Sequence, residues 1–333
     1  MPEFEKFRAL LCQLGNAIRD AVLTGRRHQS LEHLSLVAEE SAADTIYAID
    51  KLSEGAILDW FEGHWPADEP VELIFEGIDD SRPPCFPAGT DALDTKWKII
   101  LDPIDGTRGL MTDKRPAWVL AGLAPQLGEI TSLSDIKVAA MTEIPLTKQW
   151  RADQISAIEG RGIVAEALNV LDGSRAPLEL RPSRATDFRH GFASLAKFFP
   201  EGRTLTAQIE ERVWDELIGL GATKSPTIFD DQYISTGGAF YELLAGHDRF
   251  VGDLRPLVHR VLDLDSTLVC HPYDVAAALI LTEAGIVYED PDGHFPDAPL
   301  DTTSPVAWLA FANETLASKL RPVLRSTLDT MLG

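Results

Sequence analysis

Apolar residues recur every three or four positions in two stretches near the start of the chain. Over residues 4–23 they form a single stripe. Residues 42–60 repeat the pattern, and Asp50 lies there among apolar neighbours. This spacing is typical of amphipathic helices. The sequence therefore predicts two N-terminal helices, the second ending near Gly63, because glycine is a common helix terminator.

Short runs of β-branched and aromatic residues, bounded by proline or glycine, follow these helices and predict strands. They lie at residues 71–75, 97–101, 118–123, 138–144, 155–158 and 178–180. Beyond residue 182, helix and strand signals alternate. A length of 333 residues suits about two domains. We therefore expect an α+β lobe over residues 1–182 and an α/β lobe over residues 183–333.

The charge balance narrows the range of partners. Thirty Lys and Arg residues against 52 Asp and Glu residues give a formal net charge of −22, which repels nucleic acid and anionic membranes. The N-terminus lacks the features of a signal peptide. The longest apolar stretch, residues 276–284, is about half the roughly 20 residues that a membrane span needs. We expect a soluble protein that binds neither nucleic acid nor membrane.

The number and spacing of the cysteines indicate the redox state of the cellular compartment. Cys12, Cys85 and Cys270 lie far apart and form no CxxC pair. This distribution argues against a disulfide framework and against a thiolate metal site, and it favours a reducing cytoplasm.

Several familiar catalytic motifs are absent from the sequence. It contains no GxxxxGK[ST] loop, no GxGxxG after a strand, no GxSxG and no HExxH. Nucleotide-triphosphate motors, nicotinamide enzymes, serine hydrolases and zinc peptidases of the usual kinds are therefore disfavoured. Carboxylate chemistry remains.

The strongest chemical signal is the segment DPIDGT at residues 102–107, which follows the predicted strand 97–101. Asp102 and Asp105 supply two carboxylates on a short segment that contains a proline and a glycine. Hard anionic ligands of this kind suit Mg²⁺. Asp-Pro and Asp-Gly are also common turn dipeptides, so either one alone indicates only a turn.

Two weaker signals also involve carboxylates. Residues 272–285 predict a buried helix with Asp274 at its N-cap and Gly285 as its end. Aspartate is a preferred cap whether or not it binds a ligand, although free N–H groups at a helix start also attract phosphate. Glu76 follows the predicted strand 71–75, where an exposed strand-end glutamate is the simpler interpretation.

Taken together, residues 102–107, 273–277 and 283–285 resemble the inositol monophosphatase family of metal-dependent phosphatases. That family has DP[IL]DGT as its first motif and WDxAA followed by EAGG as its second. Both motifs are present here in the right order. The resemblance implies an αβαβα five-layer sandwich of the inositol monophosphatase and fructose-1,6-bisphosphatase type. It also implies a site between two lobes and, commonly, a homodimer.

The resemblance implies a set of metal ligands. Two or three Mg²⁺ ions are held in such a site, most of the ligands lying in the first lobe. The ligands implied here are Glu76, Asp102, the Ile104 carbonyl, Asp105 and Asp274.

The resemblance also implies catalytic and substrate-binding residues. Thr107 and Asp50 form the pair that activates water, assisted by Glu76, and residues 44–51 are similar to the family's helix segment D-x-V-T-x-x-D. The amides of Gly106 and Thr107 hold the phosphate. Residues 235–240 resemble the family's glycine-opened substrate helix, which places Gly237 and Gly238 at the substrate.

The chain departs from the family pattern at several positions. Gly77 stands where a second acid usually follows the metal-binding glutamate, Tyr273 replaces tryptophan and Ile286 replaces the second glycine of EAGG. The connection over residues 253–270 is longer than usual. Residues 258–260 within it could reach the substrate or cover the surface, and we expect them to cover the surface.

These observations predict a Mg²⁺-dependent phosphomonoesterase that hydrolyses a small phosphorylated polyol or sugar, similar to inositol monophosphate, by metal-activated water. Fructose-1,6-bisphosphatase or 3′(2′),5′-bisphosphate nucleotidase activity on the same fold stays open. A haloacid-dehalogenase nucleophile motif is disfavoured, since its aspartates are two positions apart whereas Asp102 and Asp105 are three apart. A non-catalytic relative that binds metal or phosphate also stays open, because Gly77 removes one acid.

Overall fold

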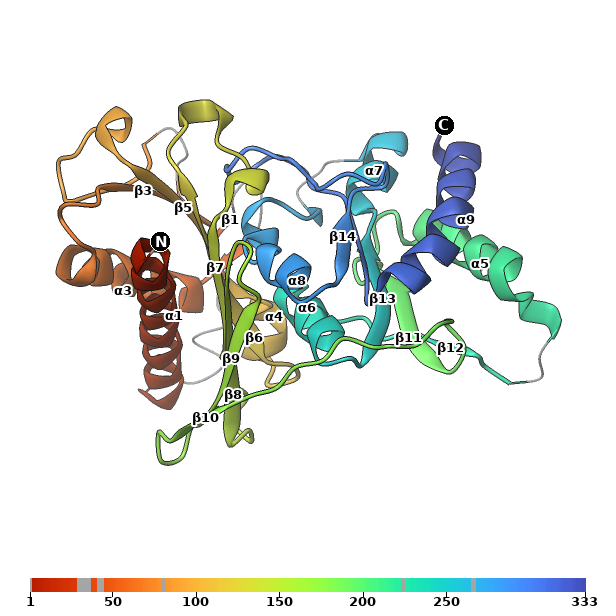
Figure 1. Cartoon of the computed structure of the whole chain (residues 1–333), viewed down its shortest axis with the longest axis horizontal. Coiled ribbons are helices and arrows are strands. Elements are labelled where there is room, and N and C mark those ends of the chain that lie inside the picture. The colour runs from red at the N-terminus through yellow and green to blue at the C-terminus, as the bar shows by residue number, and fades with distance from the viewer. Residues whose placement is uncertain (1, 29–36, 41–44, 79–81, 223–224, 265–267) are drawn as a thin grey trace.

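A computed structural model describes residues 2–28, 37–40, 45–78, 82–222, 225–264 and 268–333. Its helices alternate in space with two mixed sheets. The helices are α1 (Pro2–His28), α3 (Ala48–His64), α4 (Thr107–Met111), α5 (Arg203–Ile218), α6 (Thr236–Leu244), α7 (Arg255–Val261), α8 (Leu279–Glu283) and α9 (Glu314–Leu332). Layer by layer, α1 and α3, the first sheet, α6 and α8, the second sheet, and α5 and α9 follow one another (Figure 1). This arrangement confirms the predicted five-layer αβαβα sandwich.

The first sheet contains eight of the described strands, in the order β10-β9-β8-β7-β6-β5-β3-β4. Only β3 and β5 pair in parallel; the other neighbours are antiparallel. The strands are β3 (Val71–Phe75), β4 (Cys85–Phe86), β5 (Trp97–Asp105), β6 (Ala117–Pro125), β7 (Val138–Ile144), β8 (Arg151–Ile158), β9 (Ile163–Asn169) and β10 (Arg175–Pro177). The predicted bounds of β3 and β7 are confirmed.

The second sheet contains five of the described strands, in the order β12-β11-β13-β15-β14. Its strands are β11 (Gly191–Leu195), β12 (Ile228–Phe229), β13 (Asp248–Asp253), β14 (Val287–Glu289) and β15 (Trp308–Phe311). The two faces of the first sheet belong to two hydrophobic clusters. One cluster joins that sheet to α1 and α3, and the other runs through the central helices to the second sheet.

The apolar stripe predicted for the first N-terminal helix is buried against the first sheet, as expected for an amphipathic helix. Phe7, Leu14 and Ile18 on α1 are fully buried against the first sheet. The second predicted helix is wrong over residues 45–47, which form strand β2 (Thr45–Tyr47) and pair with β1 (Val37–Glu40). Residues 42–44 lie outside the described part of the chain. Helix α3 starts at Ala48 and ends at His64, one residue beyond the predicted end.

Two further predicted elements need correction. The strand predicted at residues 178–180 lies slightly earlier, as β10, because the pairing with β9 starts at Arg175. The single helix predicted over residues 272–285 is divided into η6 (Tyr273–Val275), a 3-10 turn, and α8. Asp274 therefore lies inside the first turn and is not its N-cap, a position that Pro272 takes. Gly285 has a φ of +83°, as expected of a helix-ending glycine.

The longer connection over residues 253–270 contains α7. Val258 and His259 on α7 are buried, so the expected surface placement is wrong for these two residues. It is correct for Arg260, which is exposed. Among the described residues, no helix is long and apolar enough to cross a membrane.

Candidate metal centre

Strand β5 extends four residues further than predicted and carries both aspartates of the DPIDGT segment. In the pairing with β6, Asp102 lies opposite Leu120 and Asp105 lies opposite Trp118. Three steps on β5 therefore match two steps on β6, which is a β-bulge. Side chains of a regular strand alternate between faces, so residues three apart would point to opposite sides. The bulge places Asp102 and Asp105 on the same face of the sheet.

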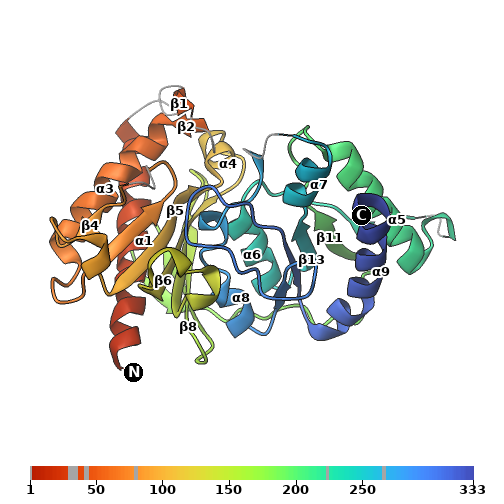
Figure 2. The same cartoon turned by 90° about the horizontal axis from the view of Figure 1, so that it is seen from above.

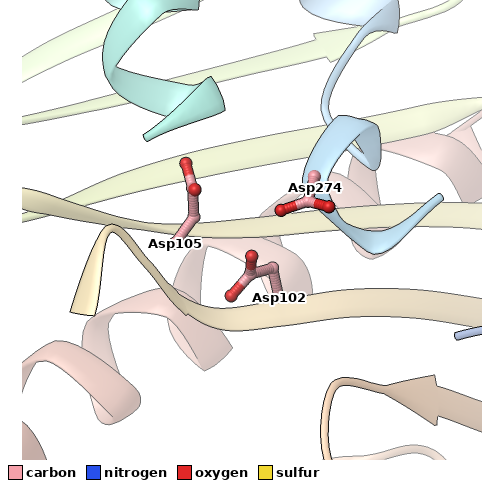
Figure 3. Close-up of side chains that lie close together, drawn as sticks. All are labelled: Asp102, Asp105 and Asp274. Carbon is pink, nitrogen blue, oxygen red and sulfur yellow. The ribbon is translucent and has the colours of Figure 1, made fainter. Parts of the chain in front are cut away.

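The third carboxylate comes from the central layer. Asp274 lies in η6, and its Oδ2 accepts a hydrogen bond from the His271 backbone N–H at 2.6 Å. Figure 3 shows its side chain directed toward those of Asp102 and Asp105. One carboxylate oxygen from each of the three residues lies within 4.8 Å of the others. We call these three residues the aspartate cluster.

The electrostatics of the aspartate cluster are those of like charges held together away from water. Burial raises the pKa of Asp102 well above its usual range, and the carboxylates of Glu76, Asp105 and Asp274 raise it further. Burial also raises the pKa of Asp105 to about 6. Among the described residues, neither Asp102 nor Asp105 forms an ion pair. Buried carboxylates of this kind need a compensating charge, and oxygen ligands suit Mg²⁺.

Helix α6 approaches Asp105 with its N-terminus (Figure 3). Oδ1 of Asp105 accepts a hydrogen bond from Thr236 N at 3.1 Å. Oδ2 accepts from the Ser235 hydroxyl at 2.8 Å and from Gly237 N at 2.5 Å. The free N–H groups at a helix start favour a negative charge. This contact fixes the orientation of the Asp105 carboxylate and joins the first sheet to the central layer.

The two glycines of α6 are required by close packing. A Cβ on Gly237 would lie 2.8 Å from the Trp118 Cβ, and one on Gly238 would lie 2.4 Å from the Tyr233 ring. The Gly237 N–H is bonded to Asp105, and the Gly238 N–H is bonded to the Ser235 hydroxyl at 2.9 Å. Their contact with a substrate stays a prediction.

The other two predicted metal ligands have different surroundings. Glu76 directly follows β3 and is half-buried. Its charge raises the pKa of Asp102, although Glu76 does not belong to the group of carboxylates that meet within 4.8 Å. The Ile104 carbonyl accepts a hydrogen bond from the Thr107 hydroxyl at 2.7 Å. Of the five predicted ligands, the structure thus brings Asp102, Asp105 and Asp274 together in one group.

Two of the predicted catalytic and phosphate-binding residues, Gly106 and Thr107, lie at the start of α4. Gly106 has a φ of +98°, which favours glycine, and it precedes Thr107, the first residue of that helix. The backbone of Asp50 belongs to α3, whereas its side chain lies outside the described part of the structure. The predicted pair of Thr107 and Asp50 therefore stays a prediction.

Two contacts were missed from the sequence, and the first of them lies at this centre. Ser235 is the N-cap of α6, and its hydroxyl also donates a hydrogen bond to Asp105. A serine before a helical pattern indicates the cap, but no nearby residue in the sequence indicates the bond to Asp105. Both carboxylate oxygens of Asp231 lie 2.7 Å from the Arg115 guanidinium, a contact between segments remote in sequence. The Arg115 side chain also lies over the Tyr233 ring, 5.0 Å from its centroid.

Comparisons with known proteins support this architecture. Three similar solved structures are the extragenic suppressor protein suhB from Bartonella henselae, fructose-1,6-bisphosphatase from Leishmania major and inositol monophosphatase from Anabaena. For the suhB protein the identity is 16% and the TM-score 0.63, over 95% of this chain and 97% of that one. For the fructose-1,6-bisphosphatase the identity is 12% and the TM-score 0.67, over 96% of this chain and 94% of that one. For the inositol monophosphatase the identity is 15% and the TM-score 0.61, over 98% of this chain and 97% of that one.

No protein-family model matches the chain, and no curated protein sequence matches it. The likeness is therefore one of structure, and it spans almost the whole of this chain and of each of the three structures. The resemblance predicted from the two motifs is confirmed at the level of the fold. The chain has the fold of the inositol monophosphatases and fructose-1,6-bisphosphatases.

Proposed function

We propose that the protein is a Mg²⁺-dependent phosphomonoesterase that acts on a small phosphorylated polyol or sugar. The observation that carries this proposal is the convergence of three aspartates within 4.8 Å, two of them buried and without an ion pair among the described residues. An arrangement of this kind is unfavourable for a protein unless a cation joins it. It occurs in a fold that known phosphatases share.

The chain's own residues have separate tasks in this proposal. Asp102, Asp105 and Asp274 hold the ions, of which we expect two or three, with Glu76 as a further ligand. The bound metal neutralises charge on the phosphoryl group and lowers the pKa of water. The amides of Gly106 and Thr107 orient the phosphate. This division makes binding and orientation the protein's main contribution, as is usual in phosphoryl transfer.

The proposed proton transfer centres on Thr107. Its hydroxyl donates to the Ile104 carbonyl at 2.7 Å, which places the oxygen within the turn that follows β5. Thr107 would take a proton from the attacking water as its own hydroxyl proton passes to the Asp50 carboxylate, which acts as the general base and orients the hydroxyl. A positioned general base of this kind contributes roughly 10²- to 10⁴-fold in rate.

The test is phosphate release from a panel of inositol phosphates, sugar phosphates, fructose 1,6-bisphosphate and 3′-phosphoadenosine 5′-phosphate, with Mg²⁺ or with EDTA. We expect Mg²⁺-dependent turnover on at least one member and a loss of about 10³-fold or more in the Asp102→Asn variant, because that substitution removes a charged ligand. The control is Asp59→Asn, the same change on the exposed face of α3, which should retain full activity.

The panel also separates the alternatives. Turnover limited to fructose 1,6-bisphosphate or to the nucleotide would move the substrate assignment within the same fold. Mg²⁺ binding without turnover on any substrate would contradict the phosphatase proposal and favour a non-catalytic metal-binding relative.

A further inference from the structure

Helix α6 contacts the first sheet at its middle as well as at its N-terminus. Figure 2 shows it between the two sheets, beside β6. Trp118 on β6 lies directly opposite Asp105 in the strand pairing. The Trp118 ring stacks on the ring of Tyr241, with centroids 5.1 Å apart and planes at 29°. Tyr241 belongs to α6, so the helix that holds Asp105 also packs on the strand neighbour of Asp105.

Tyr241 adds a polar contact to this packing. Its hydroxyl donates a hydrogen bond to Asp153 Oδ2 at 2.7 Å. The Asp153 side chain is only 2% exposed, and the Arg151 guanidinium holds both of its oxygens, at 2.6 Å and 2.5 Å. The acceptor is therefore fixed in place on β8. Hydrogen bonds to charged groups are stronger than neutral ones, roughly 1.5 to 3 kcal/mol in net terms.

We propose that Tyr241 is a positioning residue of the metal centre. Its hydroxyl bond to Asp153 sets the axial position and rotation of α6, and thereby the three donors that orient the Asp105 carboxylate. These donors are Thr236 N, Gly237 N and the Ser235 hydroxyl. The inference rests on the proposed function in one respect, which is that Asp105 serves as a metal ligand.

The geometry makes the position of Asp105 sensitive to that of α6. The helix has nine residues, and Tyr241 lies five positions after Thr236, so a shift at Tyr241 is transmitted along a short, hydrogen-bonded rod to the donors. Ligand sites need their groups held to within about 0.5 Å. Gly237 packs closely on Trp118, so α6 cannot leave the sheet without breaking this contact, although it could still slide along the surface of the sheet. The Tyr241 bond opposes that sliding.

The experiment compares Tyr241→Phe with Tyr288→Phe. Both substitutions remove one hydroxyl and keep the ring. The Tyr288 hydroxyl is buried and has no hydrogen-bond partner among the described residues. Its ring also contacts α6, at 5.9 Å from that of Phe240. The control therefore tests the loss of a buried hydroxyl beside the same helix.

Hydrogen exchange of the metal-free protein is the first measurement. The Thr236 and Gly237 amides are bonded to Asp105, so we expect them to exchange slowly in the unchanged protein. In Tyr241→Phe we expect their exchange to accelerate by about 10-fold or more, because the helix start becomes mobile. In Tyr288→Phe we expect the unchanged rate.

Mg²⁺ affinity, measured by calorimetry without substrate, is the second measurement. We expect a weakening of about 3- to 30-fold in Tyr241→Phe, in the range that outer contacts of metal ligands produce, and none in Tyr288→Phe. Where turnover is measurable, kcat at low Mg²⁺ should fall and saturating Mg²⁺ should restore most of it. A residue that serves stability alone would not give this restoration.

Unchanged amide exchange and unchanged Mg²⁺ affinity in Tyr241→Phe would overturn the inference, as would equal effects in Tyr288→Phe. Accelerated exchange together with weaker Mg²⁺ binding supports it even if no phosphate ester is hydrolysed, in which case the proposed function fails alone. If the unchanged protein binds no Mg²⁺, the metal-centre role of Tyr241 is overturned together with that function.

Discussion

Two groups of carboxyl side chains, most of them buried, lie at the face of the first sheet that α6 covers. One is the aspartate cluster, and the other is the pair formed by Glu143 on β7 and Asp153 on β8, which we call the carboxyl pair. Helix α6 contacts both groups, through its N-terminus at Asp105 and through Tyr241 at Asp153. Asp102 and Asp105 are about as buried as the carboxyl pair but differ from it in what compensates their charge.

The carboxyl pair is compensated from within the protein. Arg151 binds Asp153 through two hydrogen bonds, and Tyr241 supplies a third. Glu143 accepts from Gln149 Nε2 and from Asp153 N, each at 2.9 Å, and burial raises its pKa to about 7. A guanidinium therefore neutralises one carboxylate, and a proton neutralises much of the other near pH 7.

Within the aspartate cluster, Asp102 and Asp105 have no such ion pair among the described residues. The donors around Asp105 and Asp102 are backbone N–H groups and one hydroxyl, which solvate charge without cancelling it. The comparison teaches that burial alone does not mark a functional site. Asp102 and Asp105, which form no ion pair among the described residues, belong to a group that could hold a cation, whereas Asp153 is neutralised within the protein.

The same substitution, aspartate to asparagine, should therefore act in opposite directions at the two groups. At the carboxyl pair we expect Asp153→Asn to lower the free energy of unfolding by about 2 to 3 kcal/mol, since Arg151 loses its charged partner. Chemical denaturation of the metal-free protein measures this change. An unchanged midpoint would contradict the structural role of the pair.

The pH dependence of stability should come in part from Glu143. Its pKa in the folded protein, about 7, lies above its ordinary value of 4.5, so the folded state binds the proton more tightly. Its contribution to stability is therefore greatest below about pH 4.5 and is lost as the pH rises to about 7. Between pH 5 and pH 7, the free energy of unfolding should fall by about 2 kcal/mol more in the unchanged protein than in Glu143→Gln.

Denaturation curves of both proteins at several pH values, in EDTA, provide that comparison. Parallel pH profiles for Glu143→Gln and the unchanged protein would show that another group carries the dependence. Since other carboxyl groups titrate in the same range, only the difference between the two proteins is informative.

The smallest effect is expected at the aspartate cluster, and it has the opposite sign. Without metal at pH 8, Asp102→Asn should raise the free energy of unfolding by about 1 kcal/mol, because it removes one of several buried like charges. Asparagine can still accept from Ile104 N through its side-chain oxygen. A thermal melt in EDTA measures this gain, with Asp59→Asn as the exposed control. Destabilisation by Asp102→Asn would mean that the cluster supports the fold in the same way as the carboxyl pair.

The sequence by itself determined the features that depend on near neighbours. The apolar stripe of α1, the strands β3 and β7 and the two acidic motifs follow from spacing and residue type, which act over a few positions. The resemblance of residues 102–107 and 273–277 to one phosphatase family also pointed to the five-layer fold. Residues 45–47 show the limit, because their helical pattern yields to pairing with β1.

Only the tertiary structure decided how the candidate ligands meet. The bulge that places Asp102 and Asp105 on one face arises from pairing with β6 and cannot be read from β5 alone. The contact with Asp274 and the approach of α6 depend on how the central layer packs on the sheet. Local sequence sets the conformation of each segment, whereas the distances among remote carboxylates are set by long-range strand pairing and packing.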